Sequence, residues 1–251
     1  MKRVLDMIRV AAKWKETVLL LGERGTGKDL VARAIHETAG RKLTSWVVVC
    51  CGALTESLVE SELFGHTSGA FTGARGPRRG LAQLSEGGTL FLDEIGVLPL
   101  HLQARFLRLV EEHRFRPVGG EEVIELSAQV VAATNRNLRG AARQGGFLPD
   151  LVDRLTVFPI HIPPVRDRRE DIPLLIRHFF GQEKRYDLWR GLEGKPLDFL
   201  ASRHWPGNVR QIRNLAKRLV MLGGSTTTSL DEVRRQYELG EIWGCEGSLE
   251  S

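Results

Sequence analysis

Gly22-Glu23-Arg24-Gly25-Thr26-Gly27-Lys28-Asp29 joins the apolar run at residues 17–21 to a segment with apolar residues at helical spacing. A strand that enters a glycine-rich turn and then a helix leaves several backbone N–H groups pointing at one spot, and that spot favours phosphate. The glycines allow close backbone approach, and Lys28 adds a positive charge for the outer phosphates. We therefore predict that residues 22–29, here called the glycine-rich loop, bind phosphate. The alternative is a chance glycine turn between a strand and a helix.

The last position of the loop departs from the usual pattern. Ser or Thr commonly stands there, because its hydroxyl binds magnesium, whereas this chain has Asp29. The aspartate either weakens a metal site or is typical of a particular family.

A second apolar run, residues 89–92, ends in the carboxylate pair Asp93 and Glu94. Downstream of a phosphate-binding loop, this arrangement is typical of a nucleotide hydrolase in which the first acid binds magnesium and the second polarises the attacking water. The alternative is a strand end with two solvated acids.

Three further runs predict strands, at residues 46–50, 128–133 and 157–162. The run at 128–133 ends in Thr134 and Asn135, and polar side chains at the carboxyl end of a buried parallel strand lie where ligands bind. A simple loop cap is the alternative for this pair. Helical patterns at residues 1–14, at 54–64 and after Pro99 alternate with the strands and indicate an α/β fold.

Pro163 and Pro164 mark the predicted end of the α/β domain, residues 1–164. Residues 165–222 form a second, helical domain, in which Asn208 and Gln211 predict a capping box and Arg210 falls in the first turn of the helix. Residues 223–251 form a tail that is weakly helical near 231–239 or flexible.

Residues 65–79 interrupt the regular pattern and place a lone aromatic, Phe71, in a glycine-rich loop. Composition alone favours a phenylalanine that packs back into the core over one presented to a partner. The nearby arginines could contact nucleic acid, although a solvated basic loop explains them as well.

The 251-residue composition indicates a globular protein, with 42% hydrophobic and 27% charged residues and a net charge of +5. The sequence pI of about 9.4 permits a nucleic-acid or nucleotide partner. No apolar run approaches the roughly 20 residues that cross a bilayer, so we expect a cytoplasmic protein without a membrane partner. Cys50, Cys51 and Cys245 lack metal-ligand or disulfide spacing, and we expect reduced thiols.

Six motifs occur in the order seen in one family. They are the glycine-rich loop, Ser61-Glu-Leu-Phe-Gly-His66, Gly69-Ala-Phe-Thr-Gly-Ala74, Gly88-Thr-Leu-Phe-Leu-Asp-Glu94, Ala133-Thr-Asn135 and Trp205-Pro-Gly-Asn-Val-Arg210. Residues 3–222 closely resemble the central AAA+ domain of bacterial enhancer-binding proteins, the activators of sigma-54 RNA polymerase. The resemblance implies a five-stranded parallel αβα sandwich of the P-loop NTPase type, followed by a small helical lid. In this fold the strand bearing Thr134 separates the strands that bear the glycine-rich loop and the acid pair.

The resemblance also implies an activity, magnesium-dependent hydrolysis of ATP, and a set of roles. Lys28 would hold the β and γ phosphates, Asp93 would bind Mg²⁺, and Glu94 would activate water. Thr134 and Asn135 resemble the first sensor of the γ-phosphate, Arg210 resembles the second sensor, and an acidic residue such as Asp29 is ordinary in the family. Arg154 resembles an arginine finger that enters the site of the neighbouring subunit in a ring, usually a hexamer.

The same resemblance reverses the expectation for Phe71. The segment Gly69, Ala70, Phe71, Thr72, Gly73 and Ala74, here called the GAFTGA loop, would grip sigma-54, with Phe71 and Thr72 at its tip. DNA binding would require a domain absent from this chain.

Two positions depart from the family pattern. Leu148 stands where an arginine is usual, and Cys50 stands where an asparagine restrains the catalytic glutamate. A thiol is a weak hydrogen-bond partner and cannot replace an amide. We expect hydrolysis to survive with altered coupling to the GAFTGA loop. The alternatives are a nucleotide-dependent protein that binds sigma-54 or another partner with weak hydrolysis, and an AAA+ motor acting on DNA.

Overall fold

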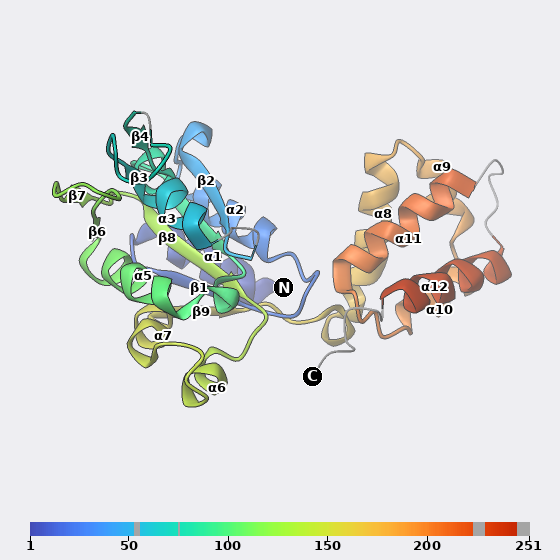
Figure 1. Ribbon diagram of the computed structural model, residues 1–251. Helices are drawn as coiled ribbons and strands as arrows, with labels where there is room; N and C mark the ends of the chain where they lie inside the picture. Colours follow the sequence, from blue (N-terminus) through green and yellow to red (C-terminus); the bar gives the residue numbers. More distant parts are fainter. Residues whose placement is uncertain (53–55, 75, 223–228, 245–251) are drawn as a thin grey trace. The chain divides into compact units, whose positions relative to one another are not determined.

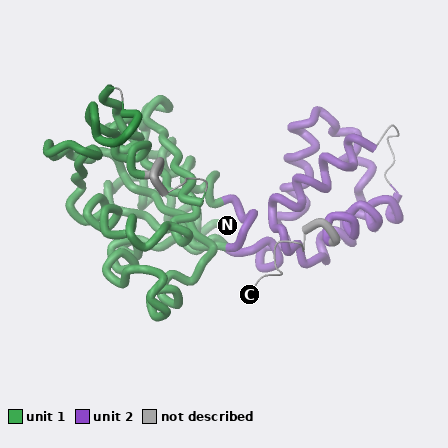
Figure 2. Tube along the Cα trace, viewed as in Figure 1, with its two compact units in different colours: residues 1–22, 28–162 green, residues 23–27, 163–251 purple. Residues whose placement is uncertain are grey.

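The computed structural model describes residues 1–52, 56–74, 76–222 and 229–244 (Figure 1). The chain forms two compact units (Figure 2). The first contains residues 1–22 and 28–162, and the second contains residues 23–27 together with residues 163–251. Residues 23–27, the middle of the glycine-rich loop, therefore pack with the second unit although the residues on both sides belong to the first.

A five-stranded parallel sheet with the order β2-β5-β8-β1-β9 forms the centre of the first unit. Its strands are β1 (Val18–Leu21), β2 (Trp46–Cys50), β5 (Thr89–Asp93), β8 (Gln129–Thr134) and β9 (Phe158–His161). β8 lies between β1 and β5, as the resemblance implies. The predicted fold class is confirmed.

Helices cover both faces of this sheet because successive residues of a strand point to opposite sides. Leu90 and Leu92 of β5 pack with one set of helices, whereas Phe91 packs with another. The helices of the first unit are α1 (Lys2–Lys13), α2 (Lys28–Thr38), α3 (Glu56–Phe64), α4 (Leu81–Leu84), α5 (Leu100–Glu112), α6 (Leu138–Arg143) and α7 (Pro149–Leu155). The result is an αβα sandwich.

Two short antiparallel hairpins were not predicted from the sequence. β3 (Gly65–His66) pairs with β4 (Arg78–Arg79) and closes the segment that carries the GAFTGA loop. β6 (Arg114–Phe115) pairs with β7 (Ile124–Glu125) directly after α5. Strands of two residues are too short to show an alternating pattern in the sequence, which explains the omission.

The second unit is helical. It contains α8 (Ile172–Gln182), α9 (Tyr186–Gly191), α10 (Lys195–Ala201), α11 (Asn208–Leu222) and α12 (Leu230–Gly244). Its core surrounds Trp205, and Tyr237 of α12 meets the Trp205 ring edge-on with 5.1 Å between centroids. The predicted division after residue 222 thus leaves out a helix that packs in the same core. No helix in the described part of the chain is long and apolar enough to span a membrane.

The start of α11 differs from the predicted capping box. The side-chain oxygen of Gln211 accepts from the backbone N–H of Gly207, at 2.9 Å, instead of from Asn208. Asn208 has a φ of +51°, outside the extended conformation of an N-cap residue. The Asn208 amide makes contacts distant in sequence instead, as described below.

Candidate functional site

The carboxyl ends of β1, β5 and β8 lie at the same edge of the sheet, as parallel strands require. The backbone N–H of Gly22 donates to the carbonyl of Thr134 at 3.4 Å, which joins the start of the glycine-rich loop to the end of β8. Lys28 Nζ donates to the Gly22 carbonyl at 2.9 Å. The structure therefore brings the loop lysine and the predicted first sensor to one edge of the sheet.

The acid pair Asp93 and Glu94 lies at this edge. The Glu94 backbone N–H donates to Asp93 Oδ1 at 3.0 Å, and Glu94 has a left-handed backbone with φ +55° and ψ +41°. Such a conformation is strained for a residue other than glycine and is concentrated at functional sites. Gly52 leaves room for the glutamate, because a Cβ there would lie 3.0 Å from Glu94 Oε2.

Burial raises the pKa of Asp93 above its usual range, and the nearby carboxylates of Glu94 and Asp29 raise it further. The hydrogen bond from the Glu94 N–H and the positive charge of Lys28 act in the opposite direction. A carboxylate whose charge is costly when buried favours a cation beside it.

The donor set fits magnesium held jointly by protein and phosphate. Mg²⁺ commonly binds one or two carboxylates together with substrate phosphates and water, and Asp93 supplies such a carboxylate. Within the described ranges, no group of three or more His, Cys, Asp or Glu side chains could hold a metal alone.

Thr134 and Asn135 occupy different environments. The Thr134 side chain is buried and its hydroxyl accepts from the Arg136 backbone N–H at 3.0 Å. Asn135 is exposed at the end of the strand. Gly96 lies against Thr134, since a Cβ on Gly96 would be only 2.7 Å from the threonine oxygen.

The middle of the glycine-rich loop lies against the start of α11. Gly25 has a φ of +75°, and a Cβ there would be 2.4 Å from the Gly207 carbonyl oxygen. The Arg210 backbone N–H donates to the Gly25 carbonyl at 3.3 Å, so the predicted second sensor is adjacent to the loop. Thr26 is buried, with its hydroxyl donating to the Glu23 carbonyl at 2.8 Å, whereas Arg24 is exposed. Gly27 also has a positive φ, and the exposed Asp29 lies in the first turn of α2.

Glu23 makes a set of contacts that the sequence did not predict. Arg166 donates to both carboxylate oxygens, at 2.8 and 2.6 Å, and Asn208 Nδ2 donates to one of them at 3.1 Å. The Arg166 hydrogen bond lowers the pKa of Glu23, partly offset by desolvation, and the same bond raises the pKa of Arg166.

Two further contacts fix the backbone of the loop. Asn208 Nδ2 donates to the Arg24 carbonyl at 3.0 Å, and Arg168 donates to the Thr26 carbonyl at 3.1 Å. Asn208 Oδ1 accepts from the Val165 N–H at 2.8 Å. A carboxylate inside a phosphate-binding loop needs a cationic partner to offset its charge, and this requirement is the sequence signal that could have directed attention to Arg166.

Arg154 lies on α7 and pairs with Glu111 of α5 at 2.5 Å, with both side chains about half exposed. Gln103, also on α5, is fully buried and binds the segment before α7. Its amide donates to the carbonyls of Leu98 and Gly146, and its oxygen accepts from the Leu148 N–H at 2.7 Å. Helix α5 therefore contacts α7 at its start, through Gln103, and near its end, through Glu111.

The two positions that depart from the family pattern lie in ordered backbone. Cys50 is exposed at the end of β2, paired in register with Asp93. Leu148 is partly buried and precedes the first residue of α7. Burial raises the pKa of the neighbouring Cys51 to about 12, so that thiol stays protonated.

The GAFTGA loop is closed by its own backbone. Gly69 N–H donates to the Ala74 carbonyl and Ala74 N–H to the Phe71 carbonyl, both at 3.0 Å. Phe71 is 44% exposed and meets the His66 ring edge-on. Thr72 and Gly73 are exposed, Ala70 is partly buried and Ala74 is buried. The loop thus presents an aromatic side chain and a hydroxyl to its surroundings.

The chain is similar in sequence to bacterial transcriptional regulators. The chain is 44% identical over 242 residues to the DNA-binding transcriptional activator HyfR of Escherichia coli K12, an alignment that covers 95% of this chain and 36% of HyfR. It is 45% identical over 240 residues to the Nif-specific regulatory protein of Azotobacter vinelandii, covering 93% of this chain and 45% of that protein. The chain therefore spans less than half the length of these two relatives.

The structure of NtrX from Brucella abortus in complex with ATP is similar to this fold, with a TM-score of 0.76 and 28% sequence identity. The match covers 99% of this chain and 62% of that one. Residues 1–161 match the model of the sigma-54 interaction domain, and residues 166–241 match that of the AAA+ ATPase lid domain. The chain therefore belongs to the family of sigma-54-dependent transcriptional activators, of which it contains the AAA+ sigma-54 interaction domain and its lid.

Proposed function

We propose that this chain hydrolyses ATP and uses the energy to remodel the closed promoter complex of sigma-54 RNA polymerase. The observation that carries the proposal is the meeting of Lys28, at the glycine-rich loop, with Asp93 and Glu94 at one edge of the sheet. Burial raises the pKa of Asp93, whereas the positive charge of Lys28 acts to lower it. The effect of Lys28 is in the direction expected where a lysine and a carboxylate serve one phosphate group and its cation. The structure of NtrX, which has a similar fold, was determined in complex with ATP and supports nucleotide binding by this chain.

In the proposed reaction, the backbone N–H groups of residues 22–27 and the Lys28 ammonium bind the phosphates. Asp93 holds Mg²⁺, which when bound would neutralise charge on the β and γ phosphates. Glu94 accepts the proton of the attacking water, and its strained backbone is of the kind concentrated at functional sites. Thr134 and Asn135 would respond to the γ-phosphate from the end of β8. Arg210 would do so from the start of α11, beside Gly25.

Arg154 is proposed to act on the nucleotide of a neighbouring subunit in a ring, most simply a hexamer. Its exposure and its position on a surface helix support this role. An arginine supplied in this way stabilises the charge of the transition state and raises the rate by ~10³ or more.

The GAFTGA loop is proposed to contact sigma-54 through Phe71 and Thr72. Phe71 is 44% exposed and is therefore accessible to a partner, as the family resemblance implies. The work of the ATPase would be transmitted to sigma-54 through this loop.

A second candidate function is nucleotide-dependent binding of sigma-54 with weak or uncoupled hydrolysis. The observation that favours it is Cys50, which lies in register with Asp93 where an amide would restrain Glu94. A thiol at this position would not restrain Glu94. Hydrolysis would then either proceed without regard to the state of the ring or be slow, because the glutamate is poorly positioned.

ATP turnover separates the two candidates. The purified oligomer should hydrolyse ATP well above a Lys28→Ala control, and it should co-migrate with sigma-54 in the presence of a transition-state analogue of ATP. Thr72→Ala should abolish the co-migration and keep the hydrolysis. Turnover equal to that of the Lys28→Ala variant would exclude the ATPase, and binding that ignores both nucleotide and Thr72 would exclude the remodelling function.

A further inference from the structure

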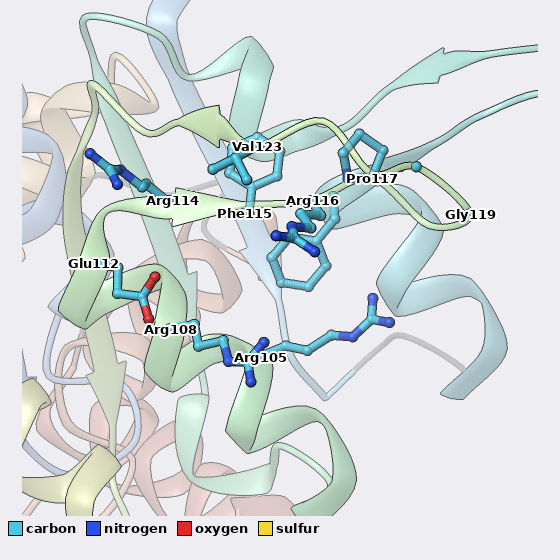
Figure 3. A pocket seen from close by; sticks show the side chains of 11 residues that line it. Arg105, Arg108, Glu112, Arg114, Phe115, Arg116, Pro117, Gly119 and Val123 are labelled. Carbon is cyan, nitrogen blue, oxygen red and sulfur yellow. The ribbon is translucent and has the colours of Figure 1, made fainter.

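A cavity of about 340 Å³ lies in the first unit between α5 and the hairpin β6–β7. Figure 3 shows Arg105 and Arg108 extending from α5 toward the same space as Arg116, which follows β6. Arg114 also lines the cavity, and Glu112 is its one acidic lining residue. The lining therefore carries four arginines against a single carboxylate.

The four arginines differ in their partners. Arg105 pairs with Glu60 at 3.2 Å and Arg114 with Glu125 at 3.4 Å. In the part of the chain that the structure describes, Arg108 and Arg116 make no ion pair. Two exposed guanidinium groups at one cavity are thus available for an anionic ligand, and guanidinium groups bind carboxylates in a bidentate way.

The cavity also has an apolar wall. Phe64 and Phe115 are buried with their ring centroids 5.9 Å apart, and both line the space. Val123 lines it as well and is 46% exposed. A ligand that fits would combine carboxylates with an apolar or aromatic side chain, as an acidic peptide segment does.

The cavity wall at residues 117–120 contacts the GAFTGA loop and the residues directly before it. Val118 lies between the lining residues Pro117 and Gly119. Its carbonyl accepts from the Thr67 N–H at 3.0 Å, and its N–H donates to the Gly65 carbonyl at 2.9 Å. Gly119 is so close to the loop that a Cβ there would lie 2.8 Å from the Ala70 Cβ. A ligand in the cavity would therefore touch the backbone that supports the loop.

We propose that this cavity binds an acidic, apolar-containing segment of the protein that the GAFTGA loop grips, which under the proposed function is sigma-54. Carboxylates of that segment pair with Arg108 and Arg116, and an apolar side chain packs on Val123. The partner is thereby held at a second point beside the loop. A DNA backbone fits less well, because the space is a concave pocket of side-chain size with an aromatic wall and because Glu112 repels a continuous row of phosphates.

The test compares sigma-54 binding by the wild-type oligomer, by Arg108→Gln with Arg116→Gln, and by Arg139→Gln with Arg143→Gln. The last pair removes the same charge from exposed residues of α6, outside the cavity. With a transition-state analogue of ATP present, the cavity variant should bind about tenfold more weakly and with less dependence on salt. The α6 variant should bind as the wild type does, and both should retain wild-type ATP turnover.

A photo-crosslinking amino acid at Val123 identifies the occupant. The crosslinked sigma-54 peptide should be rich in Asp and Glu. The same group at Leu84, which is similarly exposed at 48%, should not give that product. Equal binding by all three proteins, or crosslinks to DNA alone, would overturn the cavity proposal and leave the proposed function standing. Failure of the wild type to bind sigma-54 at all would overturn both.

Discussion

Gly25 combines a positive φ with a close approach that no side chain tolerates. Its φ of +75° costs any other residue roughly 1–2 kcal/mol, and a Cβ would meet the Gly207 carbonyl at 2.4 Å. Because the second contact is with backbone, it can be relieved only by separating the glycine-rich loop from the start of α11. We predict that Gly25→Ala lowers the melting temperature and weakens ATP binding, measured by thermal unfolding and by titration with a fluorescent nucleotide.

Gly145 provides a matched control for this change. Its φ is +76°, almost the same as that of Gly25, but nothing lies within 4 Å of the position of its Cβ. Gly145→Ala should therefore show the conformational cost alone and leave nucleotide affinity unchanged. Equal effects of the two substitutions would mean that the contact with Gly207 does not matter.

Asp93 links stability to pH in the direction opposite to that of an ion-paired carboxylate. Because its pKa is raised, chiefly by burial, the native state holds the proton to a higher pH than the unfolded state does. The free energy of unfolding contributed by this group therefore falls as pH rises from the ordinary Asp range through the raised pKa. We predict that Asp93→Asn is more stable than the wild type at pH 8, with a smaller difference at acid pH, and that it has lost ATP turnover.

Thermal unfolding of both proteins across this pH range checks the prediction. A variant that is less stable than the wild type at every pH would show that the pairing of Asp93 with Lys28 outweighs the cost of burying the charge. The same measurement with Mg²⁺ and nucleotide should raise the stability of the wild type more than that of the variant.

The candidate site residues that the sequence indicates most directly are those whose neighbours in sequence are also their neighbours in space. Lys28 is found from the turn around it, and Asp93 and Glu94 from the strand that they follow. Asn208 shows where this reasoning fails. A short polar residue before a helix predicts a cap, but its amide binds Glu23 and Val165, and no local pattern reveals partners so far along the chain.

Helix α5 supports α7 at two points of different character. Gln103 is buried and makes hydrogen bonds to three backbone groups, the carbonyls of Leu98 and Gly146 and the N–H of Leu148. Loss of its side chain would leave these groups without that partner, at a cost of about 1–3 kcal/mol for each buried group. The ion pair of Glu111 with Arg154 is half exposed and contributes at most ~1 kcal/mol. The first contact sets the position of α7, and the second sets the direction of Arg154.

This difference predicts the behaviour of Glu111→Gln. The melting temperature should change by no more than about 2 °C, because an exposed ion pair contributes little. If Arg154 acts in a neighbouring subunit, its release from Glu111 should raise ATP turnover about twofold at low protein concentration, as expected for the loss of ~0.5 kcal/mol of competing interaction. Steady-state turnover as a function of protein concentration measures this effect.

Glu37→Gln is the control, because Glu37 forms a similarly exposed ion pair with Arg33 on α2. It should change neither stability nor turnover. Unchanged turnover in the Glu111 variant, with Arg154→Ala inactive, would show that Arg154 is not restrained by its partner. Activity in Arg154→Ala equal to that of the wild type would remove the finger role itself.

Over the whole chain, the parallel sheet was predictable from the sequence, and the place of β8 between β1 and β5 followed from the family resemblance. The packing of the C-terminal helix was not predicted. Five buried apolar runs and a phosphate-binding loop are enough to indicate the parallel sheet. Helix α12 has a weak helical pattern in the sequence. Among its described side chains, Val233 and Tyr237 nevertheless belong to the apolar core around Trp205. The contribution of α12 to stability depends on how it packs against the other helices of that core, and the sequence pattern of one helix does not reveal this packing.

The contact of Glu23 with Asn208 joins residues 185 positions apart and ties the nucleotide-binding residues to the folding of the helical unit. Asn208→Ala should cost about 2 kcal/mol of stability, since the buried Val165 N–H and the loop carbonyl of Arg24 both lose their partner. It should also weaken ATP binding about tenfold, because a loop that must be ordered on binding costs roughly 1–2 kcal/mol per residue.

Asn137→Ala, which removes the exposed cap of α6, should cost ~1 kcal/mol without changing affinity. Isothermal titration and chemical denaturation separate the two effects, and a loss of stability in Asn208→Ala with unchanged affinity would show that the loop is ordered without the helical unit.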